Sequence, residues 1–600
     1  MSEVCVELVG KLVGEMLGLS KEELSPSDNL ISLGLGSLDI MRIAGLLTKN
    51  GCNVTFSELV SNPCMASWVN FARERSARSS SNGSPLLGSA NYSKGDPFPI
   101  TSVQHAYMVG RRDGQELGGT ACHAYMEFEC GSLDAAKLER AVELLILRHP
   151  MLRARFSDDG TARIEDKVTW KGLTTYRVEG AGNPDSRIEG IRQELSHLRF
   201  DIEQDDLIDV RLTVVSPKRT IMHINVDLLA ADVLSIQVLL EDLAHLYDGT
   251  DLAPIEIDFM EYARRTGIGE DARNEDREYW LNRIDNMPGG PSLPLKAPME
   301  SVKRSQFTRM EYLIDSKSWK NFTEKGRQIG VTQSMGIAAV YAKALSRWSE
   351  DKKFLLNLPL FNRKPIHPDV DKIVSDFTSL ILLEADCANA ISLLELASQM
   401  QGRFQQDVAH SSFGAVEVLR ELSHRCPNDP KKAPVVFASN IGTQFISNKV
   451  EDVFGPLSKM LAETPQVLLD HQIYDHKNGL LLAWDYVSEL LDDKIAKQMF
   501  EAYCTAVRFY CENDWSEPFP DLLPPSQRAA RAEANSEGAD LGGGTLHGRF
   551  FARAQAEPDA PALRWGADGE ATYGELAGRA LRIACLLYTS PSPRDAHESR

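Results

Sequence analysis

The sequence predicts a multidomain chain in which a small all-α four-helix bundle precedes a larger α+β domain with two lobes. Three observations lead to this fold class. The 600 residues exceed what one hydrophobic core usually supports. Residues 1–76 repeat apolar side chains at helical spacing, and a segment rich in Ser, Gly and Asn follows them. Beyond that segment, helical patterns alternate with short aliphatic runs that are typical of strands.

Residues 1–76 are expected to form the helical bundle. Apolar residues recur three and four positions apart in VCVELVGKLVGEMLGL, SLDIMRIAGLLTKNG and SELVSNPCMASWVNFARER, which is the spacing of one helix face. Gly51 follows the second of these segments and is typical of a helix C-terminus. Residues 77–97 are expected to be a flexible linker, because their composition buries too little apolar surface to order itself.

Residues 98–520 are expected to form the α+β domain. Helical patterns such as DAAKLERAVELLILRH and TQSMGIAAVYAKALSRW alternate with strand-like runs such as TIMHINVDLL, KFLLNLPLF, APVVFAS and GLLLAWDYV. This length is large for a single core, so we expect two lobes with a cleft between them.

Three segments complete the chain. Residues 521–544 are expected to be a second linker, which ends in SEGADLGGG. Residues 545–587 are expected to open a further domain, but they are too few to close a core. Residues 588–600, YTSPSPRDAHESR, abandon the preceding pattern and are interpreted as a non-native tail.

Composition and charge exclude several classes of protein. The formal net charge of −20, with no basic block to offset it, argues against a nucleic-acid binder. No apolar run is long enough to span a membrane, and the N-terminus lacks the basic region of a signal peptide. The ten cysteines form no CxxC pair, so we expect reduced thiols, no metal site and a cytoplasmic location.

Ser37 is the first candidate for chemistry. It follows Gly34 and Gly36 in LGLGSL and precedes an apolar-periodic helix. A serine at this place is a natural helix N-cap. The alternative is an exposed hydroxyl that carries a phosphate-linked arm at the helix N-terminus, where the helix dipole favours an anion.

Asp227, Asp232 and Ser235 are the second candidate group. They lie where the strand-like run HINVD gives way to a helical pattern in LLAADVLSIQVLLEDL. The two carboxylates could cap the helix or line a buried strand end with salt-bridge partners. No histidine or further acid lies at ligand spacing, so the pattern does not favour a metal site.

Eight ordered motifs in residues 98–520 resemble the heterocyclization domains of nonribosomal peptide synthetases, which are relatives of condensation domains. The motifs are FPITSVQHAYMVGRR, RHPMLRARF, VDLLAADVLS, GPSLPL, VTQSMGIAAVYAKALSRW, LNLPLFNR with SDFTSLILLE, APVVFASNIG and TPQVLLDHQ. Ordinary condensation domains carry His-His-x-x-x-Asp-Gly at the strand end. This chain has the Asp-x-x-x-x-Asp-x-x-Ser of the heterocyclization family, as Asp227, Asp232 and Ser235.

The two ends of the chain resemble further domains of the same synthetases. LGLGSL resembles the attachment motif Leu-Gly-x-Asp-Ser-Leu/Ile of aryl or peptidyl carrier domains, with Gly36 in the place of the aspartate. ATYGELAGRALRIACLL resembles the first helix of an adenylation domain, whose phosphate-binding loop is absent here. The resemblance implies that Ser37 carries 4′-phosphopantetheine, installed by a phosphopantetheinyl transferase.

The resemblance also implies a fold and a mechanism for residues 98–520. The fold is two chloramphenicol-acetyltransferase-like lobes with a tunnel that two carrier arms enter. Asp470, in PQVLLDHQ, is the implied acid/base of cyclodehydration, and Gln466 and Gln472 are candidates to orient it or the amide. The family usually pairs this aspartate with a threonine, where this chain has Ala438.

The strand-end residues receive mainly structural roles from the resemblance. Asp232 is expected to pair with Arg363 in PLFNR, and Ser235 is expected to cap the helix or support its neighbours. Asp227 is expected to face the tunnel, where it positions the amine or polar backbone, and Asp227 and Asp232 are also candidate catalytic residues beside Asp470 and Gln472.

The order of domains resembles the start of siderophore synthetases of the pyochelin and yersiniabactin type. It implies an aryl, salicyl-like thioester on the carrier, an aryl-acid-activating adenylation enzyme and a downstream cysteinyl carrier domain as partners, and a thiazoline as product. Two other interpretations stay open. One is a condensation-only or non-catalytic docking relative, which Gly36 and Ala438 favour. The other is a stand-alone acyltransferase, a class that normally needs a histidine base at the strand end.

Overall fold

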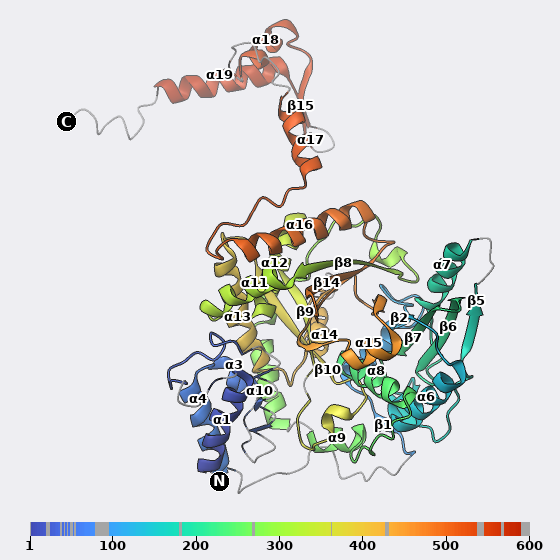
Figure 1. Cartoon of the computed structure of the whole chain (residues 1–600). Helices are drawn as coiled ribbons and strands as arrows, with labels where there is room; N and C mark the ends of the chain where they lie inside the picture. The colour runs from blue at the N-terminus through green and yellow to red at the C-terminus, as the bar shows by residue number, and fades with distance from the viewer. Residues whose placement is uncertain are drawn as a thin grey trace. The chain divides into compact units, whose positions relative to one another are not determined.

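The structure is a computed structural model, which divides into two compact units, Met1–Leu522 and Leu523–Arg600 (Figure 1). Each unit is described here by itself. The described residues are 2–17, 19, 24–35, 39–40, 43–44, 46–47, 52, 54, 56–78, 95–178, 183–266, 270–361, 363–426, 431–536, 545, 547–565 and 569–589.

The N-terminal residues form a helical domain, as the sequence predicts. Its described helices are α1 (Ser2–Leu17), α3 (Phe56–Ser61) and α4 (Met65–Arg78). Val9 and Trp68 are fully buried in its core, and the Trp68 indole N–H donates to the carbonyl of Leu59 at 2.9 Å. Ser37 lies outside the described residues.

The first lobe of the α+β domain is built on a five-stranded sheet in the order β12-β2-β7-β6-β5. The pairings are antiparallel except for β5 with β6, and three strands form a separate small sheet in the order β1-β4-β3. The strands are β1 (Phe98–Pro99), β2 (His123–Cys130), β3 (Ala154–Ser157), β4 (Thr161–Ile164), β5 (Thr174–Arg177), β6 (Ile208–Ser216), β7 (Arg219–Asp227) and β12 (Leu457–Glu463). The helices are α5 (Ser102–Gly110), α6 (Ala135–Arg148), α7 (Pro184–Leu195), α8 (Val233–Tyr247), α9 (Phe259–Thr266) and α15 (Asn448–Phe454), with a 3₁₀ turn η2 (Pro150–Arg153).

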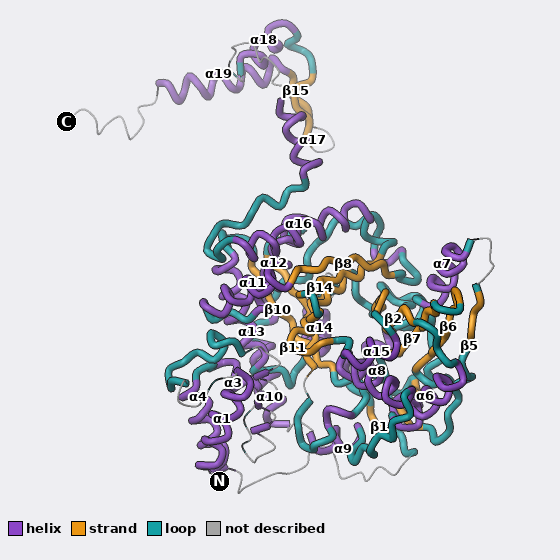
Figure 2. The backbone as a smooth tube through the Cα atoms, in the orientation of Figure 1, coloured by secondary structure: helices purple, strands orange, loops and turns teal. Residues whose placement is uncertain are grey.

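The second lobe is built on a six-stranded sheet in the order β10-β9-β11-β13-β14-β8 (Figure 2). Strand β11 runs parallel to β9 and β13, and the other pairings are antiparallel. The strands are β8 (Phe307–Asp315), β9 (Lys353–Phe361), β10 (Thr378–Asp386), β11 (Val435–Gln444), β13 (Leu469–His476) and β14 (Gly479–Val487). The helices are α10 (Glu270–Leu281), α11 (Ser316–Gln328), α12 (Gln333–Trp348), α13 (Leu393–Val408), α14 (Ala415–Arg425) and α16 (Asp493–Glu512), with 3₁₀ turns η3 (Ile284–Asn286), η4 (Met299–Ser301) and η5 (Val370–Lys372).

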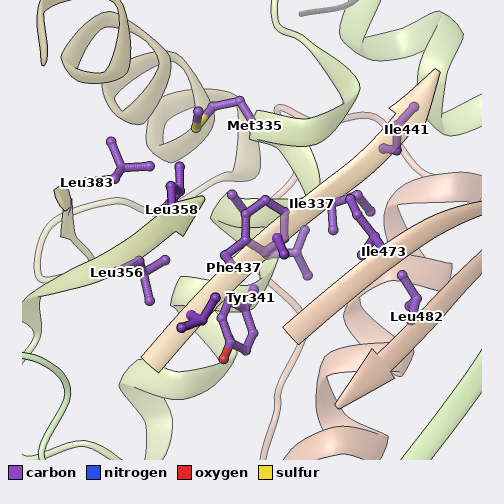
Figure 3. Packing of buried hydrophobic residues seen from close by; sticks show 14 of the residues in the cluster. Met335, Ile337, Tyr341, Leu356, Leu358, Leu383, Phe437, Ile441, Ile473 and Leu482 are labelled. Carbon is purple, nitrogen blue, oxygen red and sulfur yellow. The ribbon is translucent and has the colours of Figure 1, made fainter. Parts of the chain in front are cut away.

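Helix α12 fills the core of the second lobe because it is apolar on nearly every side. The Thr332 side chain caps its N-terminus by accepting from the backbone N–H of Met335. Figure 3 shows Tyr341 of this helix beside Phe437 of β11, and the two ring centroids lie 6.0 Å apart. This packing keeps the strands of the sheet rigid. The opposite faces of these strands carry the candidate site.

Strand β12 joins the two lobes. It follows the β11 strand of the second lobe in sequence but pairs with β2 of the first lobe, with Glu463 opposite His123. The chain then returns to the second lobe at Leu469, where β13 begins. Residues around this crossing therefore lie at the junction of the lobes.

The unit Leu523–Arg600 contains most of the expected linker 521–544. Part of the expected linker 521–544 is the helix α17 (Pro525–Ser536), because PSQRAARAEANS is rich in Ala, Arg and Glu, which are good helix formers. The following elements are α18 (Gly548–Ala556), β15 (Pro561–Trp565), β16 (Gly569–Thr572) and α19 (Tyr573–Thr589). Residues 537–544 and 590–600 lie outside the described residues.

The predicted reduced thiols are present at several cysteines. Cys122, Cys130 and Cys387 are among the free thiols. Cys52 is disulfide-bonded, so the expectation of reduced thiols throughout the chain is wrong at this position.

Within the described part of the chain, no helix has the length and apolar character to cross a membrane.

Candidate active site

A cavity of about 520 Å³ lies between the two lobes of the α+β domain. Tyr107 of α5 and Asp232, at the start of α8, line it from the first lobe. Asn357 of β9, Asp376 before β10, and Asp470 of β13 line it from the second lobe. The cleft expected between two lobes is therefore present, and it contains several polar side chains in an otherwise apolar lining.

Asp470 lies in this cavity, as the sequence predicts. Its side chain is 6% exposed, and Oδ2 accepts a hydrogen bond from Nε2 of Gln472 at 2.5 Å. Its Oδ1 is buried and makes no hydrogen bond to a described residue. Burial and the nearby charge of Asp485 raise the pKa of Asp470 to about 7. A carboxyl group of this kind can both accept and donate a proton near neutral pH.

A network behind Asp470 fixes the orientation of Gln472. Arg309 of β8 binds Asp485 through Nε at 2.7 Å and donates to Oε1 of Gln472 from Nη2 at 2.9 Å. The hydroxyl of Tyr474 donates to the same oxygen. Because Oε1 faces two donors, the amide NH₂ of Gln472 is directed toward Asp470. Strand alternation places residues 470, 472 and 474 on one face of β13.

Gln466 does not share this orienting role. It lines the cavity just after the β12 crossing, with a positive φ of 63°, and its backbone N–H donates to the carbonyl of Leu117 at 2.7 Å. Within the described residues, no hydrogen bond joins its side chain to Asp470. Gln466 lines the same cavity as Asp470, and its other predicted role, orienting the amide, stays a prediction.

Ala438 leaves a gap in hydrogen-bonding capacity beside this network. It lies opposite Gln472 in the parallel pairing of β11 with β13, and it lines the cavity. The neighbouring Ser439 lies on the other face of β11, where its Oγ is 2.7 Å from Oγ of Ser334. The hydroxyl of Ser439 therefore does not replace the threonine of the family pattern at position 438.

The structure corrects the placement of Asp227. This residue ends β7, is fully buried and is not part of the cavity wall. Its Oδ2 accepts from Nη1 of Arg111 at 2.7 Å, and its Oδ1 accepts from the backbone N–H of Leu229 at 3.0 Å. The expectation that Asp227 faces the tunnel is wrong, because the Arg111 guanidinium, just after α5, pairs with the carboxylate in the interior of the first lobe.

Asp232 is the N-cap of α8 and forms the predicted pair with Arg363. Its Oδ1 accepts from the backbone N–H of Ser235 at 2.7 Å and from Nη2 of Arg363 at 3.0 Å. Its Oδ2 accepts from the backbone N–H of Phe377 at 3.3 Å. The carboxylate therefore joins the first lobe to the segment that leads into β10 of the second lobe.

Ser235 supports the same junction and is not the helix cap. Its hydroxyl donates to the carbonyl of Ser375 at 2.7 Å. Its oxygen accepts from Nη2 of Arg363 at 2.8 Å and from the backbone N–H of Ser375 at 3.1 Å. All three hydrogen-bonding positions of the hydroxyl are used, so Ser235 has no proton or lone pair left for a substrate.

Asp376 and Asn357 are among the cavity residues that received no role from the sequence. Asp376 and Asn357 each have a buried side-chain oxygen without a hydrogen bond to a described residue. The sequence signal for Asn357 is a lone polar residue within the apolar run FLLNLPLF, and that for Asp376 is the acid in SDFTS just before an apolar strand. An unpaired polar group in a buried strand is unusual and marks a candidate binding position.

A second cavity, of about 360 Å³, adjoins the first. Met460 and Tyr474 line both cavities. Arg309, Gln444 and Asp475 belong to the wall of the second cavity. The Tyr474 hydroxyl, which supports Gln472, thus stands at the boundary between the two spaces.

Comparisons with known proteins agree with this fold and site. Residues 98–513 match the condensation domain family, and residues 7–72 match the phosphopantetheine attachment site family. The chain is 35% identical over 589 residues to phenyloxazoline synthase MbtB of Mycolicibacterium paratuberculosis, covering 96% of this chain and 50% of that protein. It is 35% identical over 601 residues to pyochelin synthetase PchE of Pseudomonas aeruginosa, covering 99% of this chain and 41% of that protein. The chain therefore spans about half or less of the length of these relatives.

Solved structures give the same result. The cyclization-docking bidomain of the EpoB nonribosomal peptide synthetase from Sorangium cellulosum is 30% identical, with a TM-score of 0.64, and covers 70% of this chain and 87% of its own. The nonribosomal peptide synthetase FmoA3 is also 30% identical, with a TM-score of 0.66, and covers 84% of this chain and 52% of its own. The chain therefore belongs to the condensation domain family. More particularly, it is a carrier-plus-cyclization segment of the nonribosomal peptide synthetase type.

Proposed function

We propose that this chain holds an aryl, salicyl-like thioester on its carrier domain and condenses it with carrier-bound cysteine. It then closes and dehydrates the product to a thiazoline in siderophore biosynthesis. The observation that carries this proposal is the buried carboxyl group of Asp470, which lies between the lobes with its pKa raised to about 7. The names of the relatives MbtB and PchE, an aryl-oxazoline synthase and a siderophore synthetase, support the class of product.

Asp470 serves the ring-closing step. The cysteine sulfur attacks the new amide carbon, and the carbonyl oxygen becomes a hydroxyl group as the thiol proton is transferred. The C–O bond then breaks as Asp470 donates a proton to the leaving hydroxyl, and the nitrogen passes its proton to the resulting Asp470 carboxylate as the C=N bond forms. Hydroxyl is a poor leaving group, so this protonation needs a positioned acid with a pKa close to the working pH.

The carrier arm and the partners complete the proposal. Ser37 would bear 4′-phosphopantetheine, installed by a phosphopantetheinyl transferase, although Gly36 replaces the aspartate of the family pattern. The partners would be an aryl-acid-activating adenylation enzyme and a downstream cysteinyl carrier domain. Two tethered reactants convert a bimolecular encounter into a local one, which lowers the entropic part of the barrier. We place the carrier at 1–76 and the cyclization domain at 98–520.

Intact-protein mass tests the two halves of the proposal. The chain is incubated with coenzyme A and a phosphopantetheinyl transferase, with Ser37→Ala as the matched control. One added arm on the chain and none on the variant is expected, and an unmodified chain contradicts the carrier assignment.

The salicyl-loaded chain is then mixed with a cysteinyl carrier, and a serinyl carrier competes in parallel. Amide formation followed by loss of one water supports heterocyclization, whereas a persistent linear amide supports the condensation-only alternative.

The variant Asp470→Ala separates the two chemical steps. We expect amide formation to persist and dehydration to fall by roughly 10²- to 10⁴-fold, which is the usual contribution of a general acid/base. Asp452→Ala, an exposed carboxylate on α15, is the control and is expected to retain both steps. Equal loss of both steps in Asp470→Ala contradicts the assignment of this residue to ring closure.

A further inference from the structure

Asp376 is a buried carboxyl group in the cavity. It has no role in the proposed ring closure. Its side chain is 1% exposed and lies on the cavity wall just before β10. Its Oδ1 accepts from the backbone N–H of Thr378 at 3.0 Å, whereas Oδ2 is buried and has no hydrogen-bond partner among the described residues. An unsatisfied carboxylate oxygen is costly to bury unless a ligand supplies its partner.

The strand-end motif of the first lobe holds Asp376 in place. Asp232 accepts from the backbone N–H of Phe377, directly after Asp376, and the Asp232 backbone N–H donates to the carbonyl of Ser375, directly before it. The Ser235 hydroxyl bonds both the N–H and the carbonyl of Ser375. Residues of the α8 N-terminus therefore form hydrogen bonds to the backbone on both sides of Asp376.

Within the part of the chain that the structure describes, Asp376 forms no ion pair, although Arg420 and Lys432 line other parts of the same cavity. Asp232 is neutralised by Arg363, whose guanidinium also lies over the Phe377 ring at 4.3 Å. Tyr107 of α5 is partly buried and lines the same cavity, and burial followed by the charge of Asp376 raises its pKa. Burial, with a contribution from Asp232, raises the pKa of Asp376 to about 7.

We propose that Asp376 binds the α-ammonium group of the incoming aminoacyl thioester and accepts one proton from it before amide formation. The inference rests on the proposed function and assigns a separate carboxyl group to its first step, with Asp470 kept for ring closure. A cationic ligand supplies the partner that Oδ2 lacks, and a carboxylate is the group that such a ligand requires. A buried carboxylate with a raised pKa is also a better base than an exposed one.

The proton and bond balance of this step is complete without a further reactant. Asp376 takes one proton from the ammonium group, which leaves a neutral amine and a protonated carboxyl group. The amine nitrogen attacks the thioester carbon, the C–N bond forms, and the C–S bond breaks. The second proton that the nitrogen loses goes to the departing sulfur, which leaves as the thiol of the carrier arm. Asp376 returns its proton to solvent between cycles.

The variant Asp376→Asn tests the inference, with Asp371→Asn as the matched control from the exposed turn η5 nearby. With a cysteinyl carrier in single-turnover mass measurements, amide formation is expected to fall about 100-fold or more in Asp376→Asn and to stay unchanged in Asp371→Asn. When the linear aryl-cysteinyl amide is supplied already attached to the carrier, Asp376→Asn is expected to close the ring at the normal rate. That second measurement shows that the variant is folded.

An acceptor whose amine is already neutral separates proton transfer from a merely structural role. A carrier loaded with aminooxyacetate presents a weakly basic nitrogen, and a β-alanyl carrier presents an ordinary amine on a chain of the same length. We expect Asp376→Asn to be slow with the β-alanyl carrier and close to the unmodified chain with the aminooxyacetyl carrier. Normal amide formation by Asp376→Asn with cysteine overturns the inference, as does equal loss with both acceptors. Failure of the unmodified chain to form any amide instead rejects the proposed function.

Discussion

At the scale of single residues, the site contains two carboxyl groups that are kept away from water without a dedicated cation. Asp470 and Asp376 both have pKa values raised to about 7, with burial as the main cause. Other acids of the same domain are neutralised, Asp227 by Arg111 and Asp232 by Arg363. The contrast between paired and unpaired acids therefore separates the residues that hold the fold from those available for proton transfer.

The raised pKa of Asp470 predicts a specific dependence of stability on pH. A carboxyl group that ionises near pH 7 when folded, but near pH 4 when unfolded, costs stability as pH rises between those values. Asp470→Asn removes this cost, so it should be more stabilising, relative to the unmodified chain, at pH 8 than at pH 5, by roughly 2 to 3 kcal/mol.

Melting temperatures of both proteins at pH 5 and pH 8 measure this effect. Asp452→Asn, on the exposed face of α15, is the control and should show no such change with pH. A stability difference between Asp470→Asn and the unmodified chain that does not grow with pH would contradict the assigned environment of Asp470.

At the scale of elements, the turn from β7 to α8 acts as a support for the second lobe. Asp232 and Ser235 together make hydrogen bonds to Ser375, Phe377 and Arg363, all of which precede or lead into β10. The sequence pattern at this turn is therefore explained by contacts between lobes, and the proton chemistry is carried by residues elsewhere in the cavity.

Ser235→Ala tests that explanation. The change leaves the buried N–H of Ser375 without its partner and removes one of the two donors to the Ser375 carbonyl, so we expect a loss of about 1 to 3 kcal/mol in stability. Because the bend that carries Asp376 loosens, amide formation should slow while ring closure of a supplied linear amide is retained. Ser346→Ala, which removes one hydrogen bond within α12, is the control and should lower stability less without separating the two steps.

Sequence patterns predict the elements of this fold better than the contacts between them. The alternation in TIMHINVDLL and the apolar runs around Asn357 and Ala438 give strands β7, β9 and β11, because a strand pattern is local. The Asp232–Arg363 pair was expected only through family resemblance, since 131 positions separate the two residues. Asp227 was misplaced because alternation gives the face of a strand, but not that Arg111 lies there.

At the scale of the whole molecule, the chain consists of two compact units with different roles in the proposal. Both candidate carboxyl groups, the cavity and the carrier domain lie within Met1–Leu522. The unit Leu523–Arg600 contains α18, β15, β16 and α19. The opening of a further domain at 545–587 stays a prediction, and the helix α17 lies within the expected linker.

A chain that ends at Leu522 should therefore retain the proposed activity. Because its hydrophobic cores lie within the first unit, we expect its main melting transition to match that of the full chain. Amide and ring formation from a salicyl-loaded form should also be unchanged by mass. Precipitation of the shortened chain, or loss of either product, would show that the second unit is needed for the first.

The single guanidinium of Arg309 has a wider consequence for the chemistry beside it. Asp485 already neutralises that guanidinium, so the neighbourhood of Asp470 is electroneutral only while Asp470 keeps its own proton. In the proposed ring closure, the substrate itself loses two hydrogens and one oxygen as water. Because Asp470 donates one proton and regains one within a turnover, the ring-closing step needs no proton relay to bulk solvent.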